Sequence, residues 1–197
     1  MTTAIEKTTN HARTLQMVQI AMFSVLMMIG ANISSFLIIG GVPITLQTFF
    51  ALLAGILLGS RTGAIAMVFY AFIGLVGLPV FSQFSGGLDT IVSPTFGFIV
   101  SYIFVAYVVG EIVRKFPSVK GFVIAALVGT AINYVIGTNW MYAAYKFWFD
   151  APSGFTYQMA WAWMVVPLPK DIILAVFAGI FGYRVKPILF KSLKSNV

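Results

Sequence analysis

The chain has 197 residues, of which 60% are hydrophobic and 9% are charged, and its formal net charge is +7. Soluble domains average roughly 45–50% apolar and about 25% charged residues, so this composition excludes a protein whose whole surface faces water. The absence of cysteine excludes disulfides and thiolate metal sites. The basic residues lie in short loops between apolar runs rather than in a stripe interleaved with aromatics, which argues against nucleic-acid binding.

Six apolar runs are candidates for transmembrane helices, because a bilayer core about 30 Å thick needs roughly 20 apolar residues in a helix. The first run is long and lacks a small-residue cleavage site, so we expect it to be retained rather than removed as a signal peptide. The predicted helices cover 14–37, 43–59, 63–78, 94–113, 121–144 and 159–183, with an irregular segment at 80–93 that is rich in Gly and Ser. The sequence therefore predicts an all-α membrane protein, a bundle of six transmembrane helices that forms a single domain over residues 1–197.

Two of the predicted helices are short or interrupted. The helix over 43–59 would cover only about 25 Å, and Pro167 and Pro169 interrupt the last one. Backbone that is not helical survives at membrane depth only against protein or a polar cavity. Both interruptions lie toward the same end of the predicted bundle, so we expect a binding site there.

The distribution of Lys and Arg predicts the orientation in the membrane. If the N-terminus is cytoplasmic, ten of these residues fall on the cytoplasmic side, and Lys146 and Lys170 are the two on the outer side. Such a bias is typical of cytoplasmic loops. The acids Asp89, Asp150 and Asp171 fall on the outer half. We therefore expect a multi-pass protein of the cell membrane with both termini in the cytoplasm.

The sequence lacks the residues that several kinds of catalysis and metal binding require. No Walker A sequence is present, so ATP hydrolysis by this chain alone is not expected. The single histidine, His11, precedes the first span, which leaves neither a His-based metal site nor a His-activated nucleophile in the bundle. Asp171 is the one carboxylate expected at membrane depth, so paired acid–base catalysis is unsupported. We expect no enzyme activity, no metal and no cofactor.

Polar residues gather toward the outer end of the predicted bundle and suit a small polar ligand with an anionic end. Several also have structural interpretations: Thr45 and Gln47 could open a helix, Asn139 could end one, and Lys170 could extend to the interface. Asp171 follows Pro169 in a first helical turn, where an acid is favoured in any case, although an ionisable group at depth is usually functional. The candidates are Thr45, Gln47, Gln83, Ser93, Thr95, Asn139, Lys170 and Asp171.

Several motifs resemble the BioY family, the biotin-binding substrate-specificity (S) subunits of energy-coupling-factor transporters. The most specific are Val42-Pro43-Ile44-Thr45-Leu46-Gln47-Thr48-Phe49 and Gly74-Leu75-Val76-Gly77-Leu78-Pro79-Val80-Phe81. Leu58-Gly59-Ser60-Arg61-Thr62-Gly63-Ala64 and Ser85-Gly86-Gly87-Leu88 add to the resemblance, which spans nearly the whole chain.

The resemblance implies a six-helix membrane subunit that binds biotin from outside and releases it inside. A transmembrane coupling subunit and two ATPase subunits would supply the energy, and some family members are thought to act alone. Ala21 and Val25, which keep part of a small-residue pattern, would meet the coupling subunit. Gly87 and Trp140 join the eight candidates above as predicted substrate-binding residues. A related subunit for another vitamin, and a structural membrane subunit without ligand, remain alternatives.

The sequence departs from the family pattern in two places. Ser93-Pro94-Thr95-Phe96-Gly97 stands where the family usually has Gly-Pro-Thr-Gly-Gly. Pro169-Lys170-Asp171 keeps the family's acid, but the lysine usual three residues later is replaced by Leu174. Lys170 is therefore the substitute candidate for that lysine.

Overall fold

The computed structural model describes residues 2–33, 38–39 and 42–195 of the chain, and within them the fold is almost entirely helical. The residues 34–37 at the end of the first predicted span lie outside the described ranges. The described elements are, in chain order, α1 (Thr2–Asn32), β1 (Ile38–Ile39), β2 (Val42–Pro43), α2 (Gln47–Leu58), α3 (Ser60–Leu75), η1 (Ser82–Phe84), η2 (Leu88–Val92), α4 (Phe96–Lys115), α5 (Val119–Phe147), α6 (Tyr157–Val165) and α7 (Leu168–Ser195).

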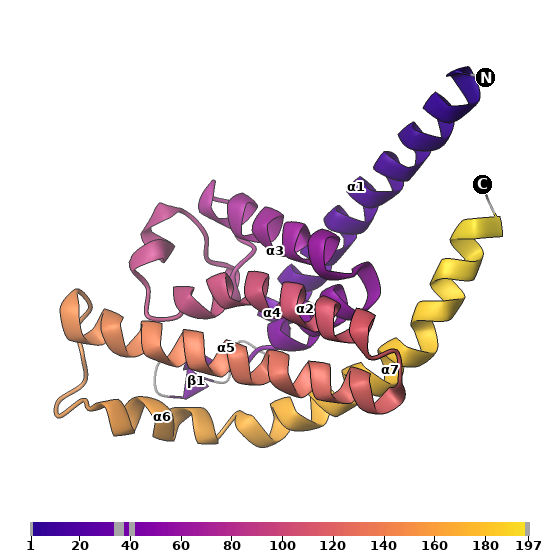
Figure 1. Ribbon diagram of the computed structural model, residues 1–197. Coiled ribbons are helices and arrows are strands. Elements are labelled where there is room, and N and C mark those ends of the chain that lie inside the picture. Colours follow the sequence, from indigo (N-terminus) through magenta and orange to yellow (C-terminus); the bar gives the residue numbers. More distant parts are fainter. Residues whose placement is uncertain (1, 34–37, 40–41, 196–197) are drawn as a thin grey trace.

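The helices form one bundle with α4 at its centre. Helix α4 packs against α2, α3 and α5, and α7 packs against α2 and α5. Both chain ends lie on one side of the bundle, and the 80–93 segment and the α5–α6 connection lie on the opposite side (Figure 1). The buried core is made largely of Ala, Val, Leu and aromatic side chains, and Tyr70 and Phe81 are among its largest members.

The structure corrects the predicted starts of the second and third helices by three or four residues. Helix α2 begins at Gln47 and not at Pro43, because Val42–Pro43 pairs as an antiparallel strand with Ile38–Ile39. Helix α3 begins at Ser60, three residues earlier than predicted, directly after Gly59. Gly59 has a φ of 82°, a left-handed conformation that glycine adopts without steric cost. That conformation lets the chain reverse between α2 and α3 in a single residue.

The predicted interruption of the last helix is confirmed, and its position is now defined. Helix α6 ends at Val165 and α7 begins at Leu168, so the break falls at Val166 and Pro167. The carbonyl of Pro167 accepts from the N–H of Asp171 at 3.0 Å and thereby starts α7. Pro169, which was also predicted to interrupt the helix, does not do so. It lies in the first turn of α7, where a backbone N–H has no partner within the helix.

Four helices of the described chain are long and apolar enough to cross a membrane: α1 over Arg13–Asn32, α4, α5, and α7 over Leu168–Leu189. Helices α2 and α3 are apolar but shorter, with 12 and 16 residues, or about 18 and 24 Å. Large apolar side chains such as Phe72, Phe104 and Ile173 are more than half exposed on the outside of the bundle. Such a surface suits lipid rather than water.

The two residues predicted to contact a partner lie on the exposed face of α1. Ala21 is exposed, and the side chain of Val25 is 51% exposed. Met17 and Met22 lie on the same open face. The structure therefore leaves this face of α1 open to lipid or to another protein.

Candidate ligand-binding site

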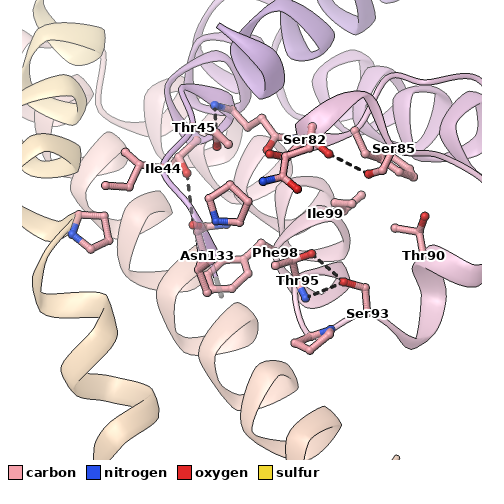
Figure 2. A pocket seen from close by; sticks show the side chains of 18 of the residues that line it. Ile44, Thr45, Ser82, Ser85, Thr90, Ser93, Thr95, Phe98, Ile99 and Asn133 are labelled. Atoms are coloured by element: carbon pink, nitrogen blue, oxygen red, sulfur yellow. Dashed lines mark hydrogen bonds between the residues drawn. The ribbon is translucent and has the colours of Figure 1, made fainter. Parts of the chain in front are cut away.

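A cavity of about 570 Å³ opens at the end of the bundle away from the chain termini. Its walls come from the start of α2, the 80–93 segment, the start of α4, the middle of α5 and the α6–α7 break. In Figure 2, Thr45 and Asn133 lie on one side, and the hydroxyl residues Ser85, Thr90 and Ser93 lie on the other. The volume lies in the range of small-molecule sites, roughly 300–1,000 Å³.

One corner of the cavity is charged. The carboxylate of Asp171, 8% exposed, accepts from the Tyr134 hydroxyl at 2.7 Å through Oδ2. Its Oδ1 lies 2.8 Å from Nζ of Lys170, which also donates to the carbonyl of Thr45 at 2.6 Å. The two charges neutralise each other, and each carboxylate oxygen keeps a lone pair for a ligand. Neighbouring residues on a helix point about 100° apart, but the long side chain of Lys170 folds back to Asp171.

A chain of buried polar side chains lies beside the charged corner. Thr48 donates to Oδ1 of Asn133 at 3.3 Å, and Nδ2 of Asn133 donates to the hydroxyl of Ser101 at 2.6 Å. The Ser101 hydroxyl in turn donates to the carbonyl of Phe98 at 2.7 Å. Asn133 and Ser101 are almost fully buried, so these bonds hold α2, α4 and α5 in one register.

The 80–93 segment is tied to the helices at its two ends. At its start, Nε2 of Gln47 donates to the hydroxyl of Tyr70 at 2.8 Å, and Tyr70 donates to the carbonyl of Val80 at 3.0 Å. At its end, Trp140 donates to the carbonyl of Ser93 at 3.0 Å, and Trp148 donates to that of Val92 at 2.7 Å. The segment is therefore a wall built on the bundle rather than a free loop.

Most of the predicted site residues line the cavity. The structure places seven of the ten there: Thr45, Gln47, Gln83, Ser93, Thr95, Lys170 and Asp171. Ser93 and Thr95 lie with their hydroxyls 2.9 Å apart just before α4. These residues come from four separate parts of the chain, so the prediction that they share one end of the bundle is consistent with their observed positions.

The other three predicted residues do not line the cavity. Asn139 is exposed on α5; its amide donates to the carbonyl of Val135 and accepts from the hydroxyl of Tyr157. Trp140 packs over Gly97 and donates to the carbonyl of Ser93. Gly87 has a φ of 101° and donates from its N–H to the carbonyl of Gly74 at 2.7 Å. Trp140 and Gly87 thus support the 80–93 segment instead of facing a ligand.

Sequence reasoning missed several polar residues that line the cavity, among them Thr48, Ser82, Tyr102, Asn133 and Tyr134. Asn133 carried a usable signal, because a buried amide in the middle of an apolar helix is commonly functional in membranes. Tyr102 and Tyr134 carried none, since aromatic residues are common throughout the chain. In the part of the chain that the structure describes, no group of three or more His, Asp or Glu residues could hold a metal ion.

Comparison with known proteins assigns the family. The BioY family model matches residues 3–191. The chain is 44% identical over 182 residues to the putative biotin transporter BioYB of Bacillus subtilis, covering 90% of this chain and 88% of that protein. It is 35% identical to the probable biotin transporter BioY of Lysinibacillus sphaericus, with 92% and 90% covered.

The fold agrees with this assignment. The crystal structure of the S-component for biotin from an ECF-type ABC transporter superposes with a TM-score of 0.77, at 22% identity, over 90% of this chain and 94% of that one. At this identity the likeness concerns the fold. Together with the apolar helices, the transporter relatives make the chain a multi-pass membrane protein. With the family model matching nearly the whole chain, this protein belongs to the BioY family.

Proposed function

We propose that this chain is the biotin-binding subunit of an energy-coupling-factor transporter, and not an enzyme. It would capture biotin outside the cell and deliver it to the cytoplasm. The names of its relatives support this substrate. The observation that carries the proposal is the cavity itself: about 570 Å³, with a hydrogen-bonding charged corner at one side and hydroxyl groups at the other.

The cavity suits the two ends of biotin. The ureido ring has two N–H donors, which the remaining lone pairs of the Asp171 carboxylate can accept. Lys170 is paired with Asp171. The two residues therefore contact the same end of a ligand, and Lys170 does not hold the carboxylate at the other end of biotin. The carboxylate of biotin then lies toward Ser93 and Thr95, at the N-terminus of α4, where backbone N–H groups favour an anion. The N-termini of α2 and α7 also border the cavity.

Mass spectrometry of the purified protein under native conditions tests the ligand directly. We expect a bound molecule with the mass of biotin, displaced by an excess of labelled biotin. A different vitamin would reassign the substrate within the same architecture. Protein without any small molecule that also fails to bind added biotin would contradict the proposal and favour a structural subunit.

Gln47→Ala and Asn139→Ala form a matched pair of amide deletions that test the site. Gln47 lines the cavity and also supports Val80 through Tyr70, so its loss should weaken biotin binding roughly tenfold, which corresponds to about 1.4 kcal/mol. Asn139 lies outside the cavity, so its loss should leave the dissociation constant unchanged. Equilibrium binding of labelled biotin measures both. The opposite ranking would place the site around Asn139.

We further propose that six apolar segments of the single domain, α1 to α5 and the α6–α7 unit, each traverse the membrane, with both termini in the cytoplasm. The shared side of the termini supports an even number of crossings (Figure 1). The connection between α4 and α5, which Arg114, Lys115 and Lys120 flank in sequence, lies on that same side, in agreement with the positive-inside bias. Reporter fusions active on one side of the membrane should report cytoplasmic N- and C-termini. An externally active C-terminal fusion would contradict this orientation.

Energy for uptake should come from a partner module of a coupling subunit and two ATPases, since the chain has no phosphate-binding loop. The exposed α1 face around Ala21 and Val25 is the proposed contact with the coupling subunit. In proteoliposomes, the chain with that module should accumulate biotin on addition of ATP, and the chain alone should not hydrolyse ATP. ATP-driven accumulation by the isolated chain would contradict the need for a partner.

A further inference from the structure

Two consecutive residues of the 80–93 segment have an unfavourable backbone conformation. Gln83 has φ 60° and ψ 32°, and Phe84 has φ 54°. Left-handed conformations of this kind are uncommon for residues other than glycine, because the β-carbon crowds the backbone. They persist where the surroundings hold them, and they are frequent at functional sites. Two such residues in sequence, of which Gln83 lines the cavity, therefore need a structural cause.

The strained pair is hydrogen-bonded to α1. The backbone N–H of Phe84 donates to Oδ1 of Asn32 at 2.8 Å, across 52 positions of sequence. Asn32 is 7% exposed and is the last residue of α1, and its Nδ2 donates to the carbonyl of Met28 at 3.0 Å. The amide is thus held at its nitrogen by its own helix while its oxygen holds the strained turn.

The rest of the turn is closed by its own hydrogen bonds. Phe81 donates from its N–H to the carbonyl of Ser85 at 3.0 Å, and the Ser85 hydroxyl donates to the carbonyl of Ser82 at 2.8 Å. These bonds define the shape of the turn but do not connect it to α1. The bond from Phe84 to Asn32 links the strained pair directly to α1.

The turn places Ser82 and Gln83 in the cavity wall. The hydroxyl oxygen of Ser82 is buried and, among the described residues, has no hydrogen-bond partner. Buried hydroxyls are normally paired, and an unpaired one at a binding site points to a missing partner. Ser82 lies on the same side of the cavity as Ser85 in Figure 2. Because Ser82 lines the cavity, a change of its side-chain rotamer would turn this hydroxyl toward a ligand.

We propose that Asn32 is a positioning residue for ligand binding, which holds the strained Gln83–Phe84 pair and thereby presents the Ser82 hydroxyl to the ligand. This rests on the proposed binding of a small polar ligand such as biotin in the cavity. Asn32 itself does not line the cavity, so its effect is transmitted through the turn. Ser82 is the contact residue and donates to an acceptor on the ligand.

Binding of labelled biotin to single and double variants tests the link. We expect Asn32→Ala and Ser82→Ala each to weaken binding about five- to tenfold, the range for one buried hydrogen bond. If Asn32 acts through Ser82, the double variant should bind biotin as well as the single variant with the lower affinity. Independent effects would instead multiply the two losses of affinity. Asn139→Ala, an amide deletion outside the cavity, is the matched control and should bind normally.

A second cycle tests the strain. Phe84→Gly removes the steric cost of the left-handed conformation, and the Phe84 side chain it deletes is 63% exposed. Asn32→Ala should therefore cost at least threefold less affinity in the Phe84→Gly background than in the unmodified protein. A merely structural role of Asn32 at the end of α1 would give equal losses in both backgrounds and would overturn the proposal.

A measurement without ligand separates this inference from the proposed function. The chain has no cysteine, so Ser82→Cys introduces a single thiol at the buried hydroxyl position. We expect slow labelling by a membrane-impermeant maleimide, and at least fivefold faster labelling when Asn32→Ala is added. Equal rates would refute the positioning role even if biotin binds. If the unmodified protein does not bind biotin but the difference in labelling rate is observed, the proposed substrate is refuted instead.

Discussion

Replacing Asp171 with asparagine is expected to lower the affinity for biotin by more than about tenfold. The Asp171 carboxylate accepts from Tyr134 and pairs with Lys170, so it is oriented toward the cavity before any ligand arrives. Asparagine keeps the shape but turns one acceptor oxygen into a donor, which opposes a ligand N–H or one of the two protein donors. Hydrogen bonds to charged groups contribute about 1.5–3 kcal/mol, which corresponds to roughly 10- to 150-fold in affinity.

Asp89→Asn is the matched control, because Asp89 also lines the cavity but is exposed and lies outside the charged corner. Its dissociation constant should change less than about threefold, on the scale of exposed charges. Lys170→Met removes the counter-charge and the donor to Thr45, and it should also weaken binding. Titration of biotin and thermal melting should be measured for all three variants. If Asp171→Asn binds normally and only melts earlier, Asp171 has a structural role at the start of α7 and none in binding.

The largest loss of stability is expected for Gly55→Ala. A β-carbon at Gly55 would lie 2.5 Å from the backbone carbonyl oxygen of Ala106, on the neighbouring helix α4. Backbone atoms cannot rotate away, so α2 and α4 would have to separate, and the Thr48–Asn133–Ser101 bonds between helices would stretch with them. Overpacking of this kind typically costs about 1–3 kcal/mol. The variant should melt earlier and yield less folded protein in detergent.

Gly182→Ala makes the same chemical change in α7 and serves as the comparison. Its β-carbon would meet the side chain of Ile56 at 2.4 Å, and a side chain can change its rotamer. We therefore expect a smaller decrease in melting temperature than for Gly55→Ala, measured in the same detergent. A larger decrease for Gly182→Ala would show that α2 and α4 are not closely held at Gly55.

The sequence alone determined the features that depend on local hydropathy and charge. It predicted an all-α membrane protein, the irregular 80–93 segment, and the interruption before α7, which the structure places at Val166 and Pro167. Each follows from a property of neighbouring residues: their transfer to lipid, the missing N–H of proline, or the freedom of glycine. The family motifs around Thr45 and Gln47 belong to the same class, because they can be read without knowing any contact.

The tertiary structure alone decided which polar side chains meet. Asn139 and Asn133 are both amides on α5, about 1.7 turns apart, yet Asn133 is buried against α2 and α4 and Asn139 is exposed. The difference depends on the angle at which α5 packs, which no local pattern encodes. Likewise, the pairing of Tyr134 with Asp171 joins residues 37 positions apart, and that of Asn32 with Phe84 joins residues 52 apart. Hydropathy brings helices into the membrane, but the contacts between their side chains are set by how the helices pack.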